Sequence, residues 1–131
     1  LPDVVLSTAE SRHVLPDTVM LKEAVFNIGR TALVVEALRT GDLDLLSQAL
    51  DDQLHQPYRL PLIPGAAEAI LAAKAQGAAA ALSGAGPSVI VFGGDPFTIL
   101  GILSNSFTQS GTPVRSFLLN TLTTGAHIKV R

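Results

Sequence analysis

Arg12 and Arg59 are the residues of this chain whose side chains are best suited to bind a small ligand. A guanidinium group presents a planar fork that can bind a carboxylate through two parallel hydrogen bonds, and such a charge-assisted contact is worth about 1.5–3 kcal/mol. Two guanidinium groups together suit a small amino acid or organic acid. For an arbitrary arginine the favoured alternative is a solvated side chain or a structural ion pair, here with Glu10, Asp51 or Asp52.

A glycine-rich hexapeptide offers a second kind of chemistry. Its residues are Ser83-Gly84-Ala85-Gly86-Pro87-Ser88, and it lies between an apolar run, 78–82, and a β-branched run, 89–92. Glycines two residues apart allow positive φ and expose successive N–H groups, while the two serines add hydroxyl groups. This combination suits a phosphate or another anion, and a glycine-rich hairpin without a ligand is the alternative.

Two further polar residues, Asp52 and His55, precede Arg59. A carboxylate near arginines keeps a depressed pKa and is a weak base, so we expect Asp52 to orient Arg59 or its loop. A loop histidine is more often structural than catalytic, and His55 is assigned a supporting role. Asn27 and Arg30, on the polar stripe of a helix, fit a solvated surface as easily as a site. No catalytic residue and no metal ligand is assigned.

Helices and strands must position these residues, and spacing and capping signals predict where they lie. A short helix capped by Ser7 or Thr8 runs to Val14, and a long one, capped by Asp17 or Thr18, is stopped by Gly41. Its wide apolar face predicts a mostly buried helix. Asp42 starts the next helix, which completes a helical hairpin. Further helices are predicted over 65–76 and, capped by Asp95, over 96–106; strands are predicted over 78–82, 89–92, 114–119 and 127–131.

The order of these elements predicts the fold class. Three prolines within 55–64 predict an ordered loop that is not a regular helix. The other elements predict an α+β domain, a ferredoxin-like sandwich in which an added helical hairpin and further helices pack on a mostly antiparallel sheet. One domain, residues 1–131, is expected.

Composition restricts the partners of this domain. Charged residues make up 15% of the chain, against about 25% in an average soluble domain, so we expect something to cover part of its surface. The net charge of −2 and the absence of a basic run argue against nucleic acid and anionic membranes. No segment has the length of a membrane span and no signal-peptide pattern is found, so a cytoplasmic location is expected. The start at Leu1 suggests a fragment that lacks a partner domain.

Three segments together resemble a known family. Residues 6–16, LSTAESRHVLP, are similar to S-T-x-x-x-R-x-x-L-P, and residues 52–59, DQLHQPYR, are similar to D-x-L-H-Q-P-Y-R. Both are segments of the homoserine kinases, a branch of the GHMP small-molecule kinase family. The hexapeptide from Ser83 to Ser88 resembles the third GHMP motif. The chain therefore resembles the C-terminal half of a homoserine kinase over its whole length.

This resemblance implies a function and a site. The implied reaction transfers the γ-phosphoryl group of ATP to the side-chain hydroxyl of L-homoserine, on the route to threonine. Arg12 and Arg59 are implied to hold the substrate carboxylate, with Thr8 in the same site. Residues of the glycine turn are implied to support the phosphate loop: Ser83, Gly84, Ala85, Gly86 and Ser88.

The family's nucleotide motif, P-x-x-x-G-L-G-S-S-A, is not found in this sequence. ATP and Mg²⁺ are therefore expected to be held mainly by an N-terminal ATP-binding domain outside the chain, and the chain alone is expected to be inactive. That domain, or a second copy in a homodimer, would cover the uncharged surface. Two alternatives stay open: another GHMP kinase, for instance one acting on mevalonate, and a stand-alone ferredoxin-like regulatory module that binds an amino acid.

Overall fold

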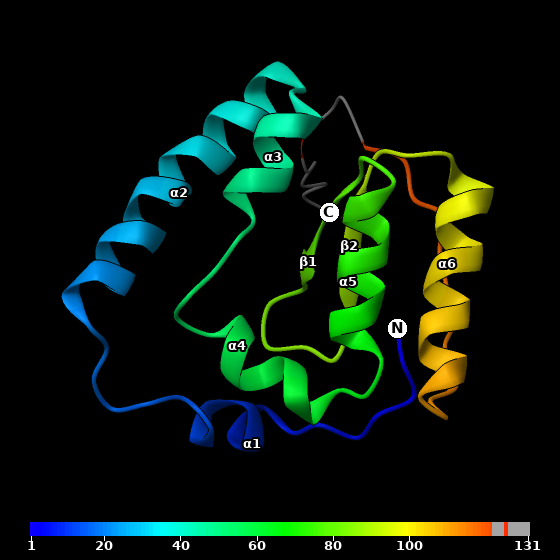
Figure 1. The fold of residues 1–131 in the computed structure, drawn as a ribbon, viewed down its shortest axis with the longest axis horizontal. Helices are drawn as coiled ribbons and strands as arrows, with labels where there is room; N and C mark the ends of the chain where they lie inside the picture. Colours follow the sequence, from blue (N-terminus) through cyan, green and yellow to red (C-terminus); the bar gives the residue numbers. More distant parts are fainter. Residues whose placement is uncertain (122–124, 126–131) are drawn as a thin grey trace, which may run out of the picture.

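The computed structural model describes residues 1–121 and 125 of the chain. Figure 1 shows helices arranged around a small antiparallel sheet, with α5 and α6 on one side and the hairpin of α2 and α3 on the other. In chain order the elements are α1 (Thr8–His13), α2 (Leu21–Thr40), α3 (Leu43–Ala49), α4 (Gln56–Arg59), the 3-10 helix η1 (Leu60–Leu62), α5 (Ala66–Ala75), β1 (Ala79–Leu82), β2 (Val89–Phe92) and α6 (Pro96–Gln109). The predicted α+β class with an added helical hairpin is confirmed.

The predicted starts of three helices are confirmed by their caps. The Ser7 hydroxyl accepts a hydrogen bond from the Glu10 amide at 3.1 Å, and the Glu10 carboxylate accepts one from the Ser7 amide at 2.9 Å. This reciprocal pair satisfies two amides that a helix start leaves without partners. Asp42 and Asp95 cap α3 and α6 through the amides of the residues three positions on.

The start of α2 differs from the prediction. The helix begins at Leu21, not after Asp17 or Thr18, because the Glu23 carboxylate accepts the Met20 amide at 3.0 Å and caps the helix there. Its end is as predicted, since Gly41 adopts a left-handed φ of 76° and its amide bonds back to Ala37.

The core lies between β1 and the helices on both of its sides. All four residues of β1 are buried, and the strand pairs with β2 in antiparallel register from Ala79 opposite Phe92 to Leu82 opposite Val89. Small side chains on β1 and α5 let the helix approach the sheet closely. The largest buried side chains of this core are Phe107 from α6 and Ile63 from the turn before α5.

Two predictions about the remaining segments are wrong within the described residues. The proline-rich segment is not simply a loop but contains α4 and η1, because its prolines occupy first-turn positions, where a helix needs no amide donor. No strand forms over 114–119; Val114 makes a single antiparallel bridge with Pro2, beside which Arg115 exchanges hydrogen bonds with Leu1, and residues 116–119 adopt no regular secondary structure. The strand predicted over 127–131 lies outside the described residues.

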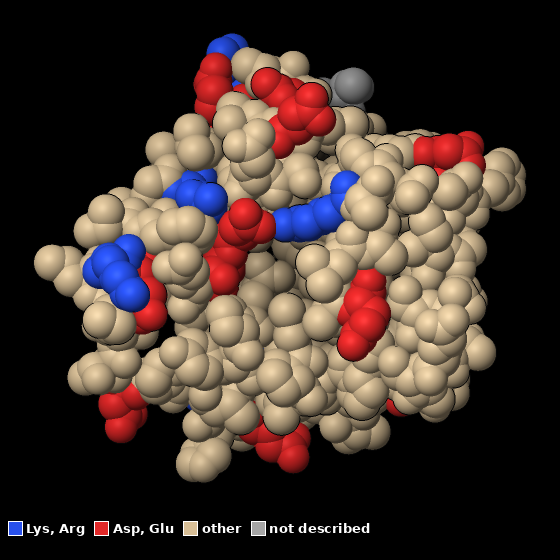
Figure 2. Space-filling model, viewed as in Figure 1, with Lys and Arg blue, Asp and Glu red and all other residues tan. Residues whose placement is uncertain are grey.

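The expected burial of α2 is also wrong. Its apolar stripe exists, but Leu21 is 80% exposed and Ile28 is 71% exposed, and Ala37 is its buried residue. Ala37 packs with Leu46 of α3 and Ala79 of β1, whereas the first turns of α2 diverge from the sheet (Figure 1). Charged side chains are few on the face shown in Figure 2, with wide uncharged areas between them. No described helix combines the length and apolar character needed to cross a membrane.

The contact between α5 and α6 depends on Gly65, which gives a first prediction. Gly65 has a φ of +89°, and a Cβ there would lie 3.0 Å from the Phe107 Cα and 3.0 Å from the Ser106 carbonyl oxygen. Gly65→Ala should therefore lower the free energy of unfolding by about 2–4 kcal/mol, through left-handed strain and overpacking.

Denaturant titration measures this, with Gly101→Ala in α6 as the control. A Cβ at Gly101 meets nothing within 4 Å, so this substitution should be neutral or stabilise the helix by up to about 1 kcal/mol. Equal effects of the two substitutions would contradict the proposed contact.

Candidate functional site

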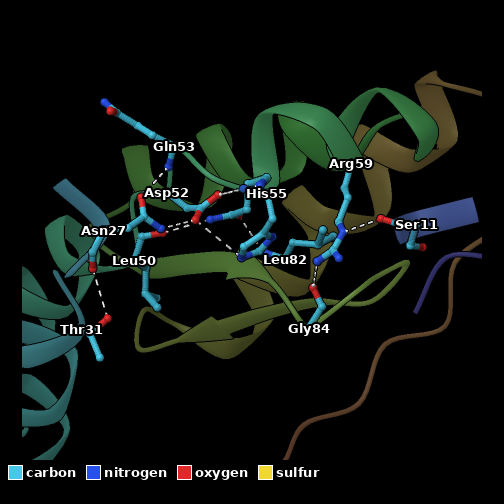
Figure 3. Close-up of polar contacts among 11 residues, drawn as sticks. Ser11, Asn27, Thr31, Leu50, Asp52, Gln53, His55, Arg59, Leu82 and Gly84 are labelled. Atoms are coloured by element: carbon cyan, nitrogen blue, oxygen red, sulfur yellow. Dashed lines mark hydrogen bonds and ion pairs between the residues drawn. The ribbon is translucent and has the colours of Figure 1, made fainter. Parts of the chain in front are cut away.

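The guanidinium group of Arg59 lies where α1, α4 and the glycine turn meet (Figure 3). Its Nε donates a hydrogen bond to the Ser11 carbonyl oxygen at 2.9 Å, and its Nη1 donates a longer one to the Gly84 carbonyl oxygen at 3.4 Å. Ser11 is the neighbour of Arg12, and Gly84 belongs to the predicted anion-binding turn. One side chain therefore brings together the three segments in which the sequence placed chemistry.

Arg59 keeps donors that a ligand could use. Its two hydrogen bonds occupy Nε and one N–H of Nη1, so the Nη2 group has no partner among the described residues. A guanidinium group can donate from all three nitrogens. Because the side chain is half-buried, its remaining donors act in a less polar surrounding than bulk water, which strengthens a contact to a carboxylate.

Arg12 and Thr8 lie on α1 next to this guanidinium group, and both are exposed. Arg12 follows Ser11, whose carbonyl oxygen accepts the hydrogen bond from the Arg59 Nε, so the Arg59 guanidinium contacts the backbone directly before Arg12. In the part of the chain that the structure describes, neither arginine forms an ion pair with a carboxylate: Glu10 bonds to Ser7, and the ion pairs found belong to other cations. The alternative role of the two arginines, a structural ion pair with a nearby carboxylate, is therefore not found among the described residues.

The glycine turn is closed by its own backbone. The Ser83 amide donates to the Ser88 carbonyl oxygen at 2.7 Å, and the Gly86 amide donates to the Ser83 carbonyl oxygen at 3.2 Å. Gly84 and Gly86 both have positive φ, and a Cβ on Gly86 would lie 2.8 Å from the Ile63 Cδ1. The turn thus requires glycine at Gly86 for conformation and for space.

Two amides of this turn stay available as donors. Among the described residues, the N–H groups of Gly84 and Ala85 have no hydrogen-bond partner. In a trans peptide the carbonyl and the following N–H point in opposite directions, so holding the Gly84 carbonyl oxygen aims the Ala85 N–H away from Arg59. The Ala85 amide and the Arg59 guanidinium therefore lie on opposite sides of the Gly84–Ala85 peptide.

Asp52 is buried at the start of the segment that ends in Arg59. Only 7% of its side chain is exposed. Its Oδ2 accepts the amides of His55 at 2.7 Å and Gln56 at 2.6 Å, and its Oδ1 accepts the side-chain amide of Asn27. Burial alone would raise the pKa of Asp52, but the amides of Gln56 and His55 and the side chain of Asn27 hold that pKa below its ordinary value. The carboxylate is thus a weak base, and it orients the loop without touching Arg59.

His55 lies beside this carboxylate. Its Nε2 is 3.7 Å from the Asp52 Oδ1, and its Nδ1 is buried without a hydrogen-bond partner among the described residues. The ring lines a pocket of about 180 Å³ together with Asn27, Arg30 and Asp51. Within the described ranges, no three histidine or acidic side chains are grouped as a metal ion would require.

Sequence reasoning gave no role to two residues of this region, Asn27 and Gln56. The Asn27 Oδ1 accepts the Gln53 amide at 2.9 Å, which joins α2 to the loop. The buried Gln56 accepts the Leu82 amide at 2.9 Å and donates to the Leu50 carbonyl oxygen at 3.0 Å, which joins the loop to β1. The sequence placed Asn27 on a polar stripe and Gln56 in a loop, and it does not reveal that their side chains bond to backbone and carboxylate groups of distant segments.

The fold and the glycine turn define a class of protein. The family model described as "GHMP kinases C terminal" matches residues 34–106, which include Asp52, Arg59 and the glycine turn. The chain belongs to the GHMP kinase C-terminal family.

Within this family the chain is similar to homoserine kinases. It is 57% identical to the homoserine kinase of Moorella thermoacetica over 93 residues, which cover 70% of this chain and 31% of that protein. It is 37% identical to the homoserine kinase of Synechococcus sp. CC9902 over 130 residues, which cover 97% of this chain and 41% of that protein. The crystal structure of the homoserine kinase of Cytophaga hutchinsonii matches 86% of this chain and 37% of its own, with a TM-score of 0.76 and 27% identity. The chain thus spans less than half the length of these relatives.

The buried carboxylate gives a second prediction. Because the folded-state pKa of Asp52 is lowered, its stabilisation is complete above the ordinary aspartate pKa of about 3.9 and is lost as the pH falls through the lowered value. Asp52→Asn should cost about 1–3 kcal/mol at pH 7, and this difference from the wild type should shrink below about pH 4.

Denaturant titrations at several pH values measure the difference. Asp51→Asn is the matched control, since Asp51 is half-exposed and pairs with Lys74 at 2.6 Å; its effect should stay below about 1 kcal/mol. A difference between wild type and Asp52→Asn that is the same at pH 7 and pH 3 would disprove this role of the carboxylate.

Proposed function

We propose that this chain is the substrate-side, C-terminal part of an ATP-dependent homoserine kinase, which phosphorylates the side-chain hydroxyl of L-homoserine on the route to threonine. The observation that carries the proposal is the meeting of the Arg12 segment, the Arg59 segment and the glycine turn at the Arg59 guanidinium group. Similarity to homoserine kinases supports this substrate.

In this proposal the two arginines bind the substrate carboxylate. The Arg59 guanidinium, whose Nη2 has no partner among the described residues, contacts the Ser11 carbonyl oxygen directly before the exposed Arg12. A carboxylate can accept from both, since it offers two oxygens with several lone-pair directions. Thr8, at the first turn of the same helix, would lie at the edge of this site. Fixing the carboxylate fixes the position of the substrate hydroxyl relative to the phosphate side.

The phosphate side is assigned to the glycine turn, with Ser83, Gly84, Ala85, Gly86 and Ser88 supporting the phosphate loop. The available amides of Gly84 and Ala85 fit a phosphate oxygen. ATP would supply the γ-phosphoryl group, and these residues would contribute position and electrostatic stabilisation, which dominate catalysis of phosphoryl transfer. The described residues hold no acidic cluster that fits Mg²⁺, so no step is assigned to a metal here.

The rest of the nucleotide site is assigned to an N-terminal ATP-binding domain outside this chain. The chain covers 31% to 41% of the relatives' length, which leaves room for such a domain. The exposed apolar stripe on α2 and the low charge content are what a domain surface that packs on another part of the protein would have. The absence of cysteine agrees with a reducing compartment such as the cytoplasm.

Arginine substitutions in the full-length protein test the substrate. Arg12→Ala and Arg59→Ala should each lower kcat/KM for homoserine roughly 10- to 100-fold, because each loses a charge-assisted contact of about 1.5–3 kcal/mol. The KM for ATP should change little in Arg12→Ala. Steady-state kinetics with homoserine and ATP measure both effects.

Arg39→Ala is the matched control, because Arg39 is an exposed arginine of α2 that pairs with Glu36. It should leave the kinetics unchanged. If homoserine phosphorylation barely falls in Arg12→Ala and Arg59→Ala, the carboxylate assignment is wrong; if the wild type phosphorylates mevalonate and not homoserine, the substrate is wrong.

The chain by itself provides a fourth prediction. Because half of the nucleotide site is assigned elsewhere, the isolated chain should release no ADP above background with ATP and homoserine, whereas the full-length protein should. Turnover by the isolated chain would overturn the division of the site. Micromolar binding of homoserine or threonine by the isolated chain, without turnover in the full-length protein, would favour the regulatory module.

A further inference from the structure

The position of Arg59 depends on Asp52, at the other end of the segment 52–59. The short helix α4 starts with the amides of His55 and Gln56 bound to Asp52, and Arg59 is the last residue of that helix. A helix of one turn is not stable alone, so its direction depends on what holds its first amides. The buried carboxylate of Asp52 therefore sets the direction in which Arg59 leaves the backbone.

Asn27 in turn holds Asp52 and the chain beside it (Figure 3). Its Nδ2 donates to the Asp52 Oδ1, and its Oδ1 accepts the Gln53 amide at 2.9 Å. The NH₂ group and the oxygen of the Asn27 side chain thus bond to two consecutive residues of the loop. The contact crosses from α2 to the loop over 25 positions of sequence.

We propose that Asn27 is a positioning residue for the substrate arginine: it fixes Asp52, Asp52 fixes the start of α4, and α4 holds Arg59 between the Ser11 and Gly84 carbonyl oxygens. The inference rests on the proposed function only in that Arg59 binds the substrate carboxylate. Asn27 itself touches no substrate and is not a catalytic residue.

The chemistry of the position requires an amide. A side chain here must donate to a carboxylate and accept from a backbone amide at once, which asparagine does and alanine does not. Aspartate would place a second carboxylate against Asp52 and remove the donor. Other charged groups line the same pocket, namely Arg30, Asp51 and His55. Arg30 and Lys74 are paired with Asp51. Among the described residues, the Asn27 amide is therefore the one side-chain donor within hydrogen-bond distance of Asp52.

The first test compares Asn27→Ala with Thr31→Ala in the full-length protein. Thr31 lies one turn further along α2, and among the described residues its hydroxyl bonds only to the Asn27 carbonyl oxygen. Asn27→Ala should raise the KM for homoserine about 10-fold or more, with kcat within about 3-fold and the KM for ATP unchanged, because a misplaced arginine weakens substrate binding. Thr31→Ala should change none of the three by more than about 2-fold. Equal KM values for homoserine in the two variants would overturn the proposal.

A second readout does not depend on turnover. The Nε–H of Arg59 donates to the Ser11 carbonyl oxygen, so its proton should exchange slowly with water in ¹⁵N–¹H NMR spectra, where Arg59→Lys identifies the signal by its loss. Exchange should be at least about 10-fold faster in Asn27→Ala and unchanged in Thr31→Ala. Unchanged exchange in Asn27→Ala would overturn the proposal. Faster exchange in a protein that does not phosphorylate homoserine would support it and refute the proposed substrate.

Asn27→Asp provides a variant of the same shape if Asn27→Ala does not fold. At pH 8 two facing carboxylates repel, and Arg59 Nε–H exchange, corrected for the intrinsic pH dependence, should be fast. At pH 5 the raised pKa of the pair lets it share one proton, which restores a donor, and exchange should slow towards that of the wild type. The same corrected exchange rate at both pH values would contradict the role of the Asn27 donor.

Discussion

The hydrogen bonds from the Arg59 guanidinium to the carbonyl oxygens of Ser11 and Gly84 are the interaction on which the site depends. They join α1, α4 and the glycine turn, which lie far apart in the sequence. A charge-assisted hydrogen bond in a half-buried position is stronger than one in water. Among the described residues the Nη2 of the same guanidinium has no partner, so the side chain that joins the three segments also keeps donors that a ligand could use.

Buried polar side chains hold the loop that carries this arginine. Asp52 accepts three donors from the loop and α2, and Gln56 joins the loop to Leu50 and Leu82. A buried polar atom without a partner costs about 1–3 kcal/mol, so each of these groups restricts the loop to the conformation in which all are satisfied. Small residues on β1 and α5 complete the arrangement by letting the helix lie close to the strand.

The surface of the chain has the character of one part of a larger protein. The apolar stripe of α2 is exposed along most of its length, and charged side chains are few (Figure 2). The chain belongs to the GHMP kinase C-terminal family and spans less than half the length of the homoserine kinases to which it is similar. The proposed two-domain kinase explains why the apolar stripe of α2 stays exposed while Ala37, near the end of the helix, is buried.

The sequence by itself determined what depends on near neighbours: a cap at Ser7 or Thr8, the caps at Asp42 and Asp95, the β1–β2 hairpin around the glycine turn, and the residue types of the three segments that meet at Arg59. Only the tertiary structure decided the burial of α2, the short helix α4 and the contacts of Asn27 and Arg59. An apolar stripe specifies a face but not the partner that covers it, and proline restricts a helix interior but not its first turn. Arg59 binds backbone carbonyl oxygens, which every residue carries, so no pattern of side chains could identify its partners before the chain was folded.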